Sequence, residues 1–441
     1  MTLALVAVLK RKGYRVQTFK VGPDFLDPSY LSLASERPCY NLDGWMSNRD
    51  YVQDLFIRTA QGADISVIEG VMGLFDGADP TTSEGSTAEI ARWLGAPILL
   101  VVDAQGMARS LAAIVKGYLD FESGLEISGV MANRCGSAKH IEWLAQSLKT
   151  SSLPPLIGGV PLGSFHPLAS RHLGLVTADA RNLSTEIMAQ LALAMEKYSS
   201  VDEVVKIARE APPLPTSSLR EKPDLPRRVR IGIAYDSAFH FYYQDLMDEL
   251  AAAGGELIHF SPIHDSQLPG GLQGLYFGGG YPEEHAEALA ANKRMLADVR
   301  QWAASGRPIY AECGGLMYLG RKLATLDGRE HSLVGLLPAT TRMLNRRKVL
   351  GYVEITLRKD SLWGARGKIM RGHEFHYSEL TSKVVGKQKW ESVYRLRRRD
   401  VASSRYEGFQ RGRILASYAH LHLASHPEAI KRFLSLCGEK I

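Results

Sequence analysis

Short apolar runs alternate with segments of helical spacing along the first part of the chain. The apolar runs predict strands at Arg15–Val21, Ile65–Ile68, Pro97–Val102 and 127–132. The segments of helical spacing predict helices at Thr2–Leu9, 50–60, Thr87–Leu94, 107–119 and 139–149, with Thr87 as an N-cap. Apolar strands that alternate with helices indicate a parallel sheet covered on both faces. We therefore predict an α/β domain over residues 1–202.

A stretch rich in proline and serine interrupts this pattern. Residues 203–228 contain a charged helical segment and then the run Ala211–Ser218, which is typical of a linker. Strands are predicted again at Val229–Tyr235, 256–260, 274–277 and 413–418, and helices at 243–253 and 286–304. Residues 229–441 are therefore predicted to form a second α/β domain.

One apolar strand of the second domain ends abruptly at a cysteine. Pro308–Ala311 leads to Glu312 and Cys313, two glycines follow, and a helical pattern resumes at Leu316. A nucleophile elbow has this outline, with the nucleophile on a sharp turn from strand to helix. The start of the helix would favour a thiolate at Cys313. Taken alone, the segment fits a small buried core cysteine equally well.

Three other polar or glycine-rich stretches of the second domain suggest chemistry. The glycines at 278–280 would let backbone N–H groups approach a developing oxyanion. A histidine of the stretch Tyr418–His422 could deprotonate the thiol and later protonate a leaving amine. Residues Arg371–Ser378 form a dense polar cluster, which we expect between two strands.

Composition narrows the class of protein. The 441 residues carry a net charge of +6. Over this length the charge is only a weak argument for binding nucleic acid, but it suits an anionic small substrate. Four cysteines without a CxxC pair argue against a disulfide framework or a structural zinc site, and for a reducing cytoplasm. The sequence has no apolar run long enough for a membrane span. We expect a cytoplasmic protein with small-molecule substrates.

The motifs of the second domain resemble a known family. In this order and spacing, GGGYPE, AECGGLMYL and SYAHLH resemble class I glutamine amidotransferases, and GHEFHYSE narrows the resemblance to the cobyrinic and cobyric acid branch. The resemblance implies a flavodoxin-like fold in which a cysteine attacks the side-chain amide of glutamine and releases ammonia. Carried over, Cys313 is the nucleophile and His420 its base, and the N–H groups of Gly279, Gly280 and Gly314 are oxyanion donors.

Other histidines of the second domain are alternatives to His420 as the base. His426 and Glu428 have the His-x-Glu form common in amidotransferases, and His422 is a further alternative. We prefer His420 because it lies directly at the end of the predicted strand. The branch resembles a Cys–His dyad without a fixed third acid, so Glu428 is expected to start a helix. His373 and His376 are expected to support the site or to be structural.

The first domain carries the second part of the resemblance. KVGPDFLDP at 20–28 and EGVMGLFDG at 69–77 are similar to segments of cobyrinate a,c-diamide synthases, whose P-loop-like ATPase domain shares its fold with dethiobiotin synthetase. Phosphoryl transfer needs Mg²⁺ held by carboxylates and a lysine on the phosphates. The resemblance implies these roles: Lys20 on the phosphates of ATP, Asp24 and Glu69 as Mg²⁺ ligands, Asp27 toward the substrate carboxylates, and Asn133 and Arg134 near the nucleotide base.

The start of the chain departs from the family pattern. Family members begin with a strand and a G-x-G-x-G-K-T-T loop, of which Met1–Leu5 resembles only the tail. Either the start is placed too late, or the protein is truncated and binds ATP poorly. We favour the first, because the acidic positions are intact. Loss of a first parallel strand would also expose a central edge of the sheet.

The resemblance covers nearly the whole chain and implies one reaction. It is the ATP-dependent, glutamine-hydrolysing amidation of the a and c carboxylates of cobyrinic acid in cobalamin biosynthesis, through acyl phosphates. Two alternatives stay open: the same chemistry on hydrogenobyrinic acid or nickel-sirohydrochlorin, and a truncated non-catalytic tetrapyrrole-binding protein. The sequence also leaves a homodimer open.

Overall fold

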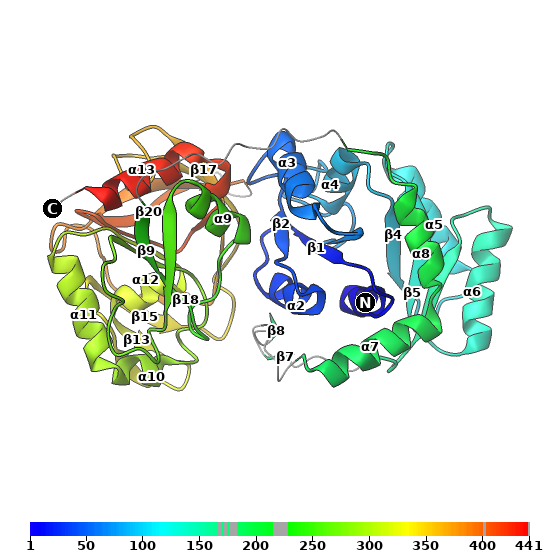
Figure 1. Cartoon of the computed structure of the whole chain (residues 1–441), viewed down its shortest axis with the longest axis horizontal. Coiled ribbons are helices and arrows are strands. Elements are labelled where there is room, and N and C mark those ends of the chain that lie inside the picture. The colour runs from blue at the N-terminus through cyan, green and yellow to red at the C-terminus, as the bar shows by residue number, and fades with distance from the viewer. Residues whose placement is uncertain (166–169, 172–173, 176–182, 215–227, 400–402, 440–441) are drawn as a thin grey trace. The chain divides into compact units, whose positions relative to one another are not determined.

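The computed structural model describes residues 1–165, 170–171, 174–175, 183–214, 228–399 and 403–439. The chain divides into two compact units (Figure 1). Unit 1 comprises Met1–Gly44 and Asn48–Leu219, and unit 2 comprises Trp45–Ser47 and Arg220–Ile441. Both units mix helices with β-sheets, as the sequence predicts.

Unit 1 contains two separate three-stranded parallel sheets, with strand orders β2-β1-β3 and β4-β5-β6. Its strands are β1 (Val16–Val21), β2 (Tyr40–Leu42), β3 (Ile65–Glu69), β4 (Ile98–Asp103), β5 (Ile127–Cys135), β6 (Leu156–Pro161), β7 (Ser170–Arg171) and β8 (Gly174–Leu175). Its helices are α1 (Thr2–Arg11), α2 (Leu26–Ser35), α3 (Arg49–Ala60), α4 (Thr87–Leu94), α5 (Ser110–Phe121), α6 (Ala138–Thr150), α7 (Thr185–Tyr198) and α8 (Val201–Arg209). The predicted helices and strands of this half are confirmed, whereas α2, β2, β6 and α7 were not predicted.

The parallel sheet predicted for this half is divided into two sheets among the residues that the structure describes. β3 and β4 are each the outer strand of their own sheet, and no described strand pairs with both. β3 is half-buried throughout, and Val101 of the apolar strand β4 is 52% exposed.

Two details of the helices of unit 1 differ from the sequence prediction. The N-cap of α4 is Ser86, whose side chain accepts a hydrogen bond from the Glu89 N–H at 3.2 Å. Thr87 is not the cap, because its hydroxyl accepts from the Val71 N–H at 3.0 Å instead. The predicted linker segment begins with most of α8, whose apolar residues are buried in the core of unit 1. The rest of that segment, over 215–227, lies outside the described residues.

Unit 2 is organised around a ten-stranded mixed sheet of order β10-β9-β11-β12-β21-β20-β19-β16-β17-β22. Its strands are β9 (Val229–Ala234), β10 (Gly255–Phe260), β11 (Gly274–Phe277), β12 (Ile309–Glu312), β16 (Val349–Leu357), β17 (Ile369–His376), β19 (Glu391–Arg398), β20 (Ser404–Arg411), β21 (Ile414–Ser417) and β22 (His420–Leu421). The five strands from β10 to β21 run parallel, and β12 lies among them between β11 and β21. The carboxyl end of β12, where Cys313 follows, is therefore central.

In the described part of unit 2, a second sheet, five α-helices and one 3₁₀ turn complete the fold (Figure 1). The sheet has the order β14-β13-β15-β18, with β13 (Gly320–Ala324), β14 (Glu330–Ser332), β15 (Leu337–Met343) and β18 (Ser378–Leu380). The helices are α9 (Gln244–Ala252), α10 (Ala286–Ala291), α11 (Lys293–Ala304), α12 (Gly314–Leu319), the 3₁₀ turn η1 (Leu423–Ser425) and α13 (Pro427–Gly438). The single helix predicted over 286–304 is two helices, because the Asn292 side chain caps α11 by accepting from the Met295 N–H.

Trp45–Ser47 belongs to unit 2 although the residues on both sides belong to unit 1. The Trp45 ring packs on Tyr352 of β16 with centroids 4.7 Å apart. The Arg371 guanidinium lies over the Trp45 ring, 4.9 Å from its centroid, and donates to the Trp45 carbonyl at 2.8 Å. The short segment is thus held by both a stacking and a hydrogen-bonding partner.

Candidate active sites

Cys313 lies on a sharp turn between β12 and α12. Its backbone has φ 46° and ψ −99°, a left-handed conformation that is rare for residues other than glycine. The Cys313 N–H donates to the Ser417 carbonyl at 2.8 Å, and its carbonyl accepts from the Met317 N–H at 3.1 Å. Such strain is kept where the surrounding structure fixes it, often at functional sites. The geometry is that of a nucleophile elbow.

The glycine loop after β11 lies beside this turn. A Cβ built on Gly314 would lie 3.1 Å from the Gly280 backbone nitrogen, so the two backbones are in contact. In the described part of the chain, the N–H groups of Gly279, Gly280 and Gly314 donate to no other residue. Gly278 differs, because its N–H donates to the Tyr242 hydroxyl at 2.8 Å. Gly278 is therefore excluded from the three glycines that the sequence offered as oxyanion donors.

His420 is the histidine that lies beside Cys313. Its ring approaches the glycine loop so closely that a Cβ on Gly279 would lie 2.5 Å from Cε1. Burial lowers the pKa of His420, but the neighbouring Cys313 and Glu312 outweigh it and raise the pKa to about 10. The ring is therefore an imidazolium at neutral pH. A cation beside the sulfur is the partner that a thiolate nucleophile needs.

The two alternative histidines have other partners. His422 Nε2 lies 3.1 Å from Asp245 Oδ2, and its Nδ1 lies 3.1 Å from the Ser425 hydroxyl. His426 precedes α13, and burial lowers its pKa to about 4. Glu428 lies in the first turn of that helix with a side chain 78% exposed, 3.7 Å from Lys368. The position of Glu428 agrees with the helix-start role predicted from the sequence.

The polar cluster around His373 is not a loop between two strands, as predicted, but is itself the strand β17. It pairs with β22 so that His373 lies opposite His420, and the two rings stack with centroids 5.0 Å apart. His373 Nδ1 lies 2.9 Å from the Tyr243 hydroxyl, and burial lowers its pKa well below the ordinary value. His376 stacks on Tyr418 instead. The pairing of β17 with β22 thus places the His373 ring against the face of the His420 ring.

One acidic residue near His420 was not predicted from the sequence. Glu312 is 3% exposed, and its Oε2 lies 3.7 Å from His420 Nδ1. The sequence led us to expect no fixed third acid. The available signal was the position of Glu312, an acid at the end of an otherwise apolar strand directly before Cys313.

A second cluster lies in unit 1, at the carboxyl ends of β1 and β3. Lys20 pairs in register with Glu69 across these strands, and its ammonium lies 3.5 Å from Glu69 Oε2 and 2.7 Å from Asp27 Oδ2. Burial lowers the pKa of Lys20, but the charges of Glu69 and Asp27 outweigh it, so the pKa is raised. Lys20 therefore stays charged although it is only 5% exposed.

Asp24 belongs to the same cluster and also stabilises the start of α2. Its Oδ1 accepts hydrogen bonds from the N–H groups of Leu26 at 2.8 Å and Asp27 at 3.1 Å, at the start of α2. Burial and the neighbouring Asp27 raise the pKa of Asp24 to about 6. One oxygen of Asp24 thus caps a helix, and the other is left for a ligand.

The donor set of this cluster fits Mg²⁺ by its chemistry. Mg²⁺ prefers oxygen ligands and is commonly held by one or two carboxylates together with phosphate oxygens. Asp24 and Glu69 offer such oxygens close to a buried ammonium. Among the described residues, no group of three or more metal-ligating side chains is assembled.

Asn133 and Arg134 form a separate group at the end of β5. Asn133 lies in register with Asp103 of β4, and Arg134 donates to Asp103 Oδ2 at 2.9 Å. Arg134 has φ 58°, and its N–H donates to the Asn133 side chain at 3.0 Å. These side chains are fixed by one another at a strand end, where ligands of parallel sheets are usually found.

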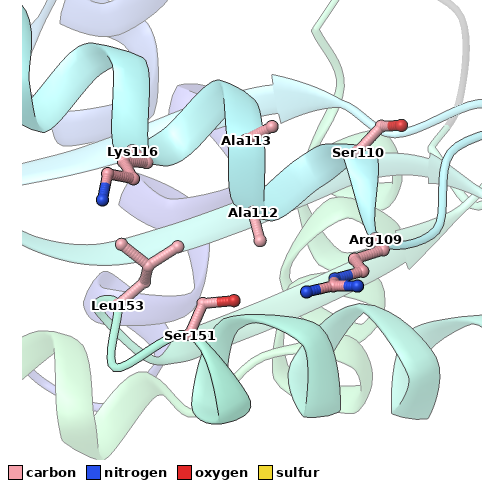
Figure 2. Close-up of a pocket in the computed structure, with 7 residues that line it drawn as sticks. All are labelled: Arg109, Ser110, Ala112, Ala113, Lys116, Ser151 and Leu153. Carbon is pink, nitrogen blue, oxygen red and sulfur yellow. The ribbon is translucent and has the colours of Figure 1, made fainter.

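A pocket of about 400 Å³ elsewhere in unit 1 contains none of the predicted site residues (Figure 2). It is lined by Arg109, Ser110, Ala112, Ala113, Lys116, Ser151 and Leu153. Most of these residues belong to the start of α5, and the others follow α6. Neither the residues around Cys313 nor those around Lys20 line this pocket.

Comparison with known proteins agrees with the two units. Residues 1–167 match the family of CobQ/CobB/MinD/ParA nucleotide-binding domains, and residues 230–428 match the family of CobB/CobQ-like glutamine amidotransferase domains. The protein is therefore of the class that joins a nucleotide-binding domain to a glutamine amidotransferase domain. A solved glutamine amidotransferase aligns with 47% of this chain and 99% of its own, with 18% identity and a TM-score of 0.34.

Relatives are similar over the whole chain. The cobyrinate a,c-diamide synthase of Syntrophotalea carbinolica is 52% identical over 99% of this chain and 95% of its own length. The enzymes of the same name from Leptospira interrogans serovar copenhageni and Dehalococcoides mccartyi strain CBDB1 are 43% and 40% identical, over 100% and 98% of this chain and 95% and 94% of their own. The chain belongs to the cobyrinate a,c-diamide synthase family. The resemblance inferred from the motifs is confirmed.

Proposed function

We propose that this protein catalyses the ATP-dependent, glutamine-hydrolysing amidation of the a and c carboxylates of cobyrinic acid, a step of cobalamin biosynthesis. The observation that carries the proposal is the pairing of Cys313, on a nucleophile elbow, with a charged His420 in a chain of this family. Unit 2 would release ammonia from glutamine. Unit 1 would activate the carboxylate that the ammonia attacks.

In the glutaminase reaction, the Cys313 thiolate attacks the side-chain carbonyl carbon of glutamine. The π electrons of that carbonyl move to its oxygen, which the N–H groups of Gly279, Gly280 and Gly314 stabilise. When the intermediate collapses, the His420 imidazolium gives its proton to the nitrogen, and ammonia leaves with the bonding pair. A glutamyl thioester remains on Cys313. Water then attacks it while His420 accepts a proton, which releases glutamate.

In the synthetase reaction, a carboxylate oxygen of the substrate bonds to the terminal phosphorus of ATP, ADP leaves with the electrons of the broken P–O bond, and an acyl phosphate results. The buried ammonium of Lys20 would neutralise phosphate charge, and Asp27 would face the substrate carboxylates. Asp24 and Glu69 would hold Mg²⁺, which supplies electrostatic stabilisation of the transferring phosphoryl group. Asn133 and Arg134 would contact the nucleotide base. Ammonia attacks the acyl carbon, and phosphate leaves.

The proposed partners are small molecules, namely glutamine, ATP and a corrinoid. We place the reaction in the cytoplasm, where glutamine and ATP are supplied. No helix in the described parts of the chain has the length and apolar character needed to cross a bilayer.

The substitution Cys313→Ser tests the division of labour between the two units. We expect glutamine-driven amidation of cobyrinic acid to be lost and ammonium-driven amidation to persist, because only the first needs the thiolate. The measurement is product formation with each nitrogen donor, with ATP and Mg²⁺ present. Loss of both activities in a folded variant would contradict the proposal, as would failure of the unmodified protein to amidate with either donor.

A further inference from the structure

The carboxylate of Glu312 is held in one orientation by three hydrogen-bond donors. Oε1 accepts from the Tyr310 hydroxyl at 2.6 Å and from the Leu421 N–H at 3.1 Å. Oε2 accepts from the Tyr276 hydroxyl at 2.8 Å. Burial and the charge of Glu312 raise the pKa of both tyrosines well above the ordinary value, so both hydroxyls remain donors. The carboxylate is thus fixed inside the core of unit 2.

Besides the Tyr276 hydroxyl, Glu312 Oε2 faces His420. His420 Nδ1 lies 3.7 Å from Oε2, and both side chains are almost fully buried, with exposures of 2% and 4%. Hydrogen bonds between catalytic groups are often long before substrate binds and tighten in the reacting complex. Since Nδ1 faces Glu312, Nε2 is the nitrogen left for Cys313. The same carboxylate also anchors the Leu421 backbone, which follows His420 in β22.

The other acids near the histidines are engaged elsewhere or exposed. Asp245 pairs with His422 at 3.1 Å, and Glu428 is an exposed residue of α13. The face of the His420 ring is covered by His373, which is neutral because burial lowers its pKa. Glu374 acts on His420 only as a more distant charge. Glu312 is therefore the acid that faces the ring edge of His420 in the described part of the chain.

We propose that Glu312 is the positioning residue of a Cys313–His420–Glu312 triad, in which the acid directly precedes the nucleophile. It fixes the ring so that Nε2 points to the thiol, and it stabilises the imidazolium while the thiolate attacks. This proposal rests on the glutaminase half of the proposed function. It differs from the His-x-Glu arrangement, in which the acid follows the histidine by two residues. Here the segment with Glu428 is left without a part in the reaction.

The test compares Glu312→Gln and Glu312→Asp with the unmodified protein. We expect Glu312→Gln to lower kcat for glutamine hydrolysis by up to about 10⁴-fold with little change in KM, because orienting acids act through the histidine. Glu312→Asp keeps the charge and should retain more of the activity. Ammonium-driven amidation should persist in both variants, which shows that the protein is folded.

A second readout separates positioning from a structural role. The rate of Cys313 alkylation by iodoacetate, relative to neutral iodoacetamide, reports the imidazolium beside the sulfur. In the unmodified protein this preference should disappear only near pH 10, and in Glu312→Gln at least about one pH unit lower, because an opposite charge nearby raises the pKa of a base by that order. An unchanged pH dependence in Glu312→Gln would overturn the proposal.

Two further variants cover the case in which both Glu312 variants fail to fold. Tyr276→Phe removes one donor that holds Oε2 and should lower glutaminase kcat about 10-fold or more, the effect of one hydrogen bond to a charged group. Tyr318→Phe is the matched control, because this buried tyrosine hydroxyl has no hydrogen-bond partner in the described structure. Equal kcat in the two variants would overturn the proposal. If the unmodified protein hydrolyses no glutamine, the proposed function fails, and the alkylation profiles alone decide the role of Glu312.

Discussion

Gly279 lies directly against the His420 ring, which makes Gly279→Ala an informative substitution. The added Cβ would lie 2.5 Å from His420 Cε1 and 3.3 Å from Nε2. Carbon atoms in contact prefer separations of about 3.5–4.0 Å, so about 1 Å must be absorbed. The backbone of Gly279 itself needs no left-handed conformation, so the effect comes from the contact alone.

Neither the His420 ring nor the Gly279 backbone can move away from this contact easily. The far face of the His420 ring stacks on His373, and β22 is paired with β17. On the other side, the Gly279 carbonyl accepts from the N–H groups of His240 at 3.0 Å and Phe241 at 3.1 Å. Overpacking of this kind costs about 1–3 kcal/mol of stability. A catalytic group misplaced by about 1 Å costs about 10²-fold in rate.

The assay is glutamate release at saturating glutamine, measured beside ammonium-driven amidation. We expect Gly279→Ala to lower glutaminase kcat by about 10²-fold and to leave ammonium-driven amidation nearly unchanged. Gly270→Ala is the matched control, since a Cβ there would meet no atom within 4 Å and the glycine is exposed. A Gly279→Ala variant with normal glutaminase kcat would refute the assigned position of His420.

Three other predictions follow from the described contacts. Glutaminase activity should fall as the pH rises through about 10, because the raised pKa keeps His420 protonated below that pH. The protonated ring also contributes to the free energy of unfolding: this contribution is fully present below pH 6.5, the ordinary pKa of histidine, and is lost as the pH rises toward 10. Urea unfolding of the protein and of His420→Asn across this pH range measures it. Asp27→Asn, which removes one of the two carboxylates on Lys20, should impair amidation more than glutamine hydrolysis; an equal loss of both rates would mark Asp27 as structural. Gly117→Ala in the exposed middle of α5 should raise the free energy of unfolding by about 0.5–1 kcal/mol in thermal melts, with no effect on either rate.

The sequence was sufficient where one local pattern determines the structure. The apolar strand before Cys313 and the glycines after it predict the elbow, because the turn needs small residues at that place. The same holds for Lys20 and Glu69, which end parallel strands and therefore meet at one edge of a sheet. The roles of these residues in catalysis stay predictions.

Sequence reasoning failed where the structure depends on contacts distant in the chain. Glu312 was overlooked because its contact with His420 joins β12 to β22, and the acid before Cys313 does not by itself reveal that contact. β17 was not predicted as a strand because its histidines and Glu374 break the apolar alternation, although they are buried by pairing with β16 and β22. The capping role of Ser86 was missed because Thr87 is an equally good cap by composition.

The brief passage of the chain through unit 2 at Trp45–Ser47 has a consequence for dividing the protein. A glutaminase fragment that begins at residue 229 has a continuous sequence but lacks these three residues. In that fragment, Tyr352 would lose the indole packed on it, and Arg371 would lose both the ring and the carbonyl that it binds. The unit that folds is thus larger than the sequence segment that encodes its sheet.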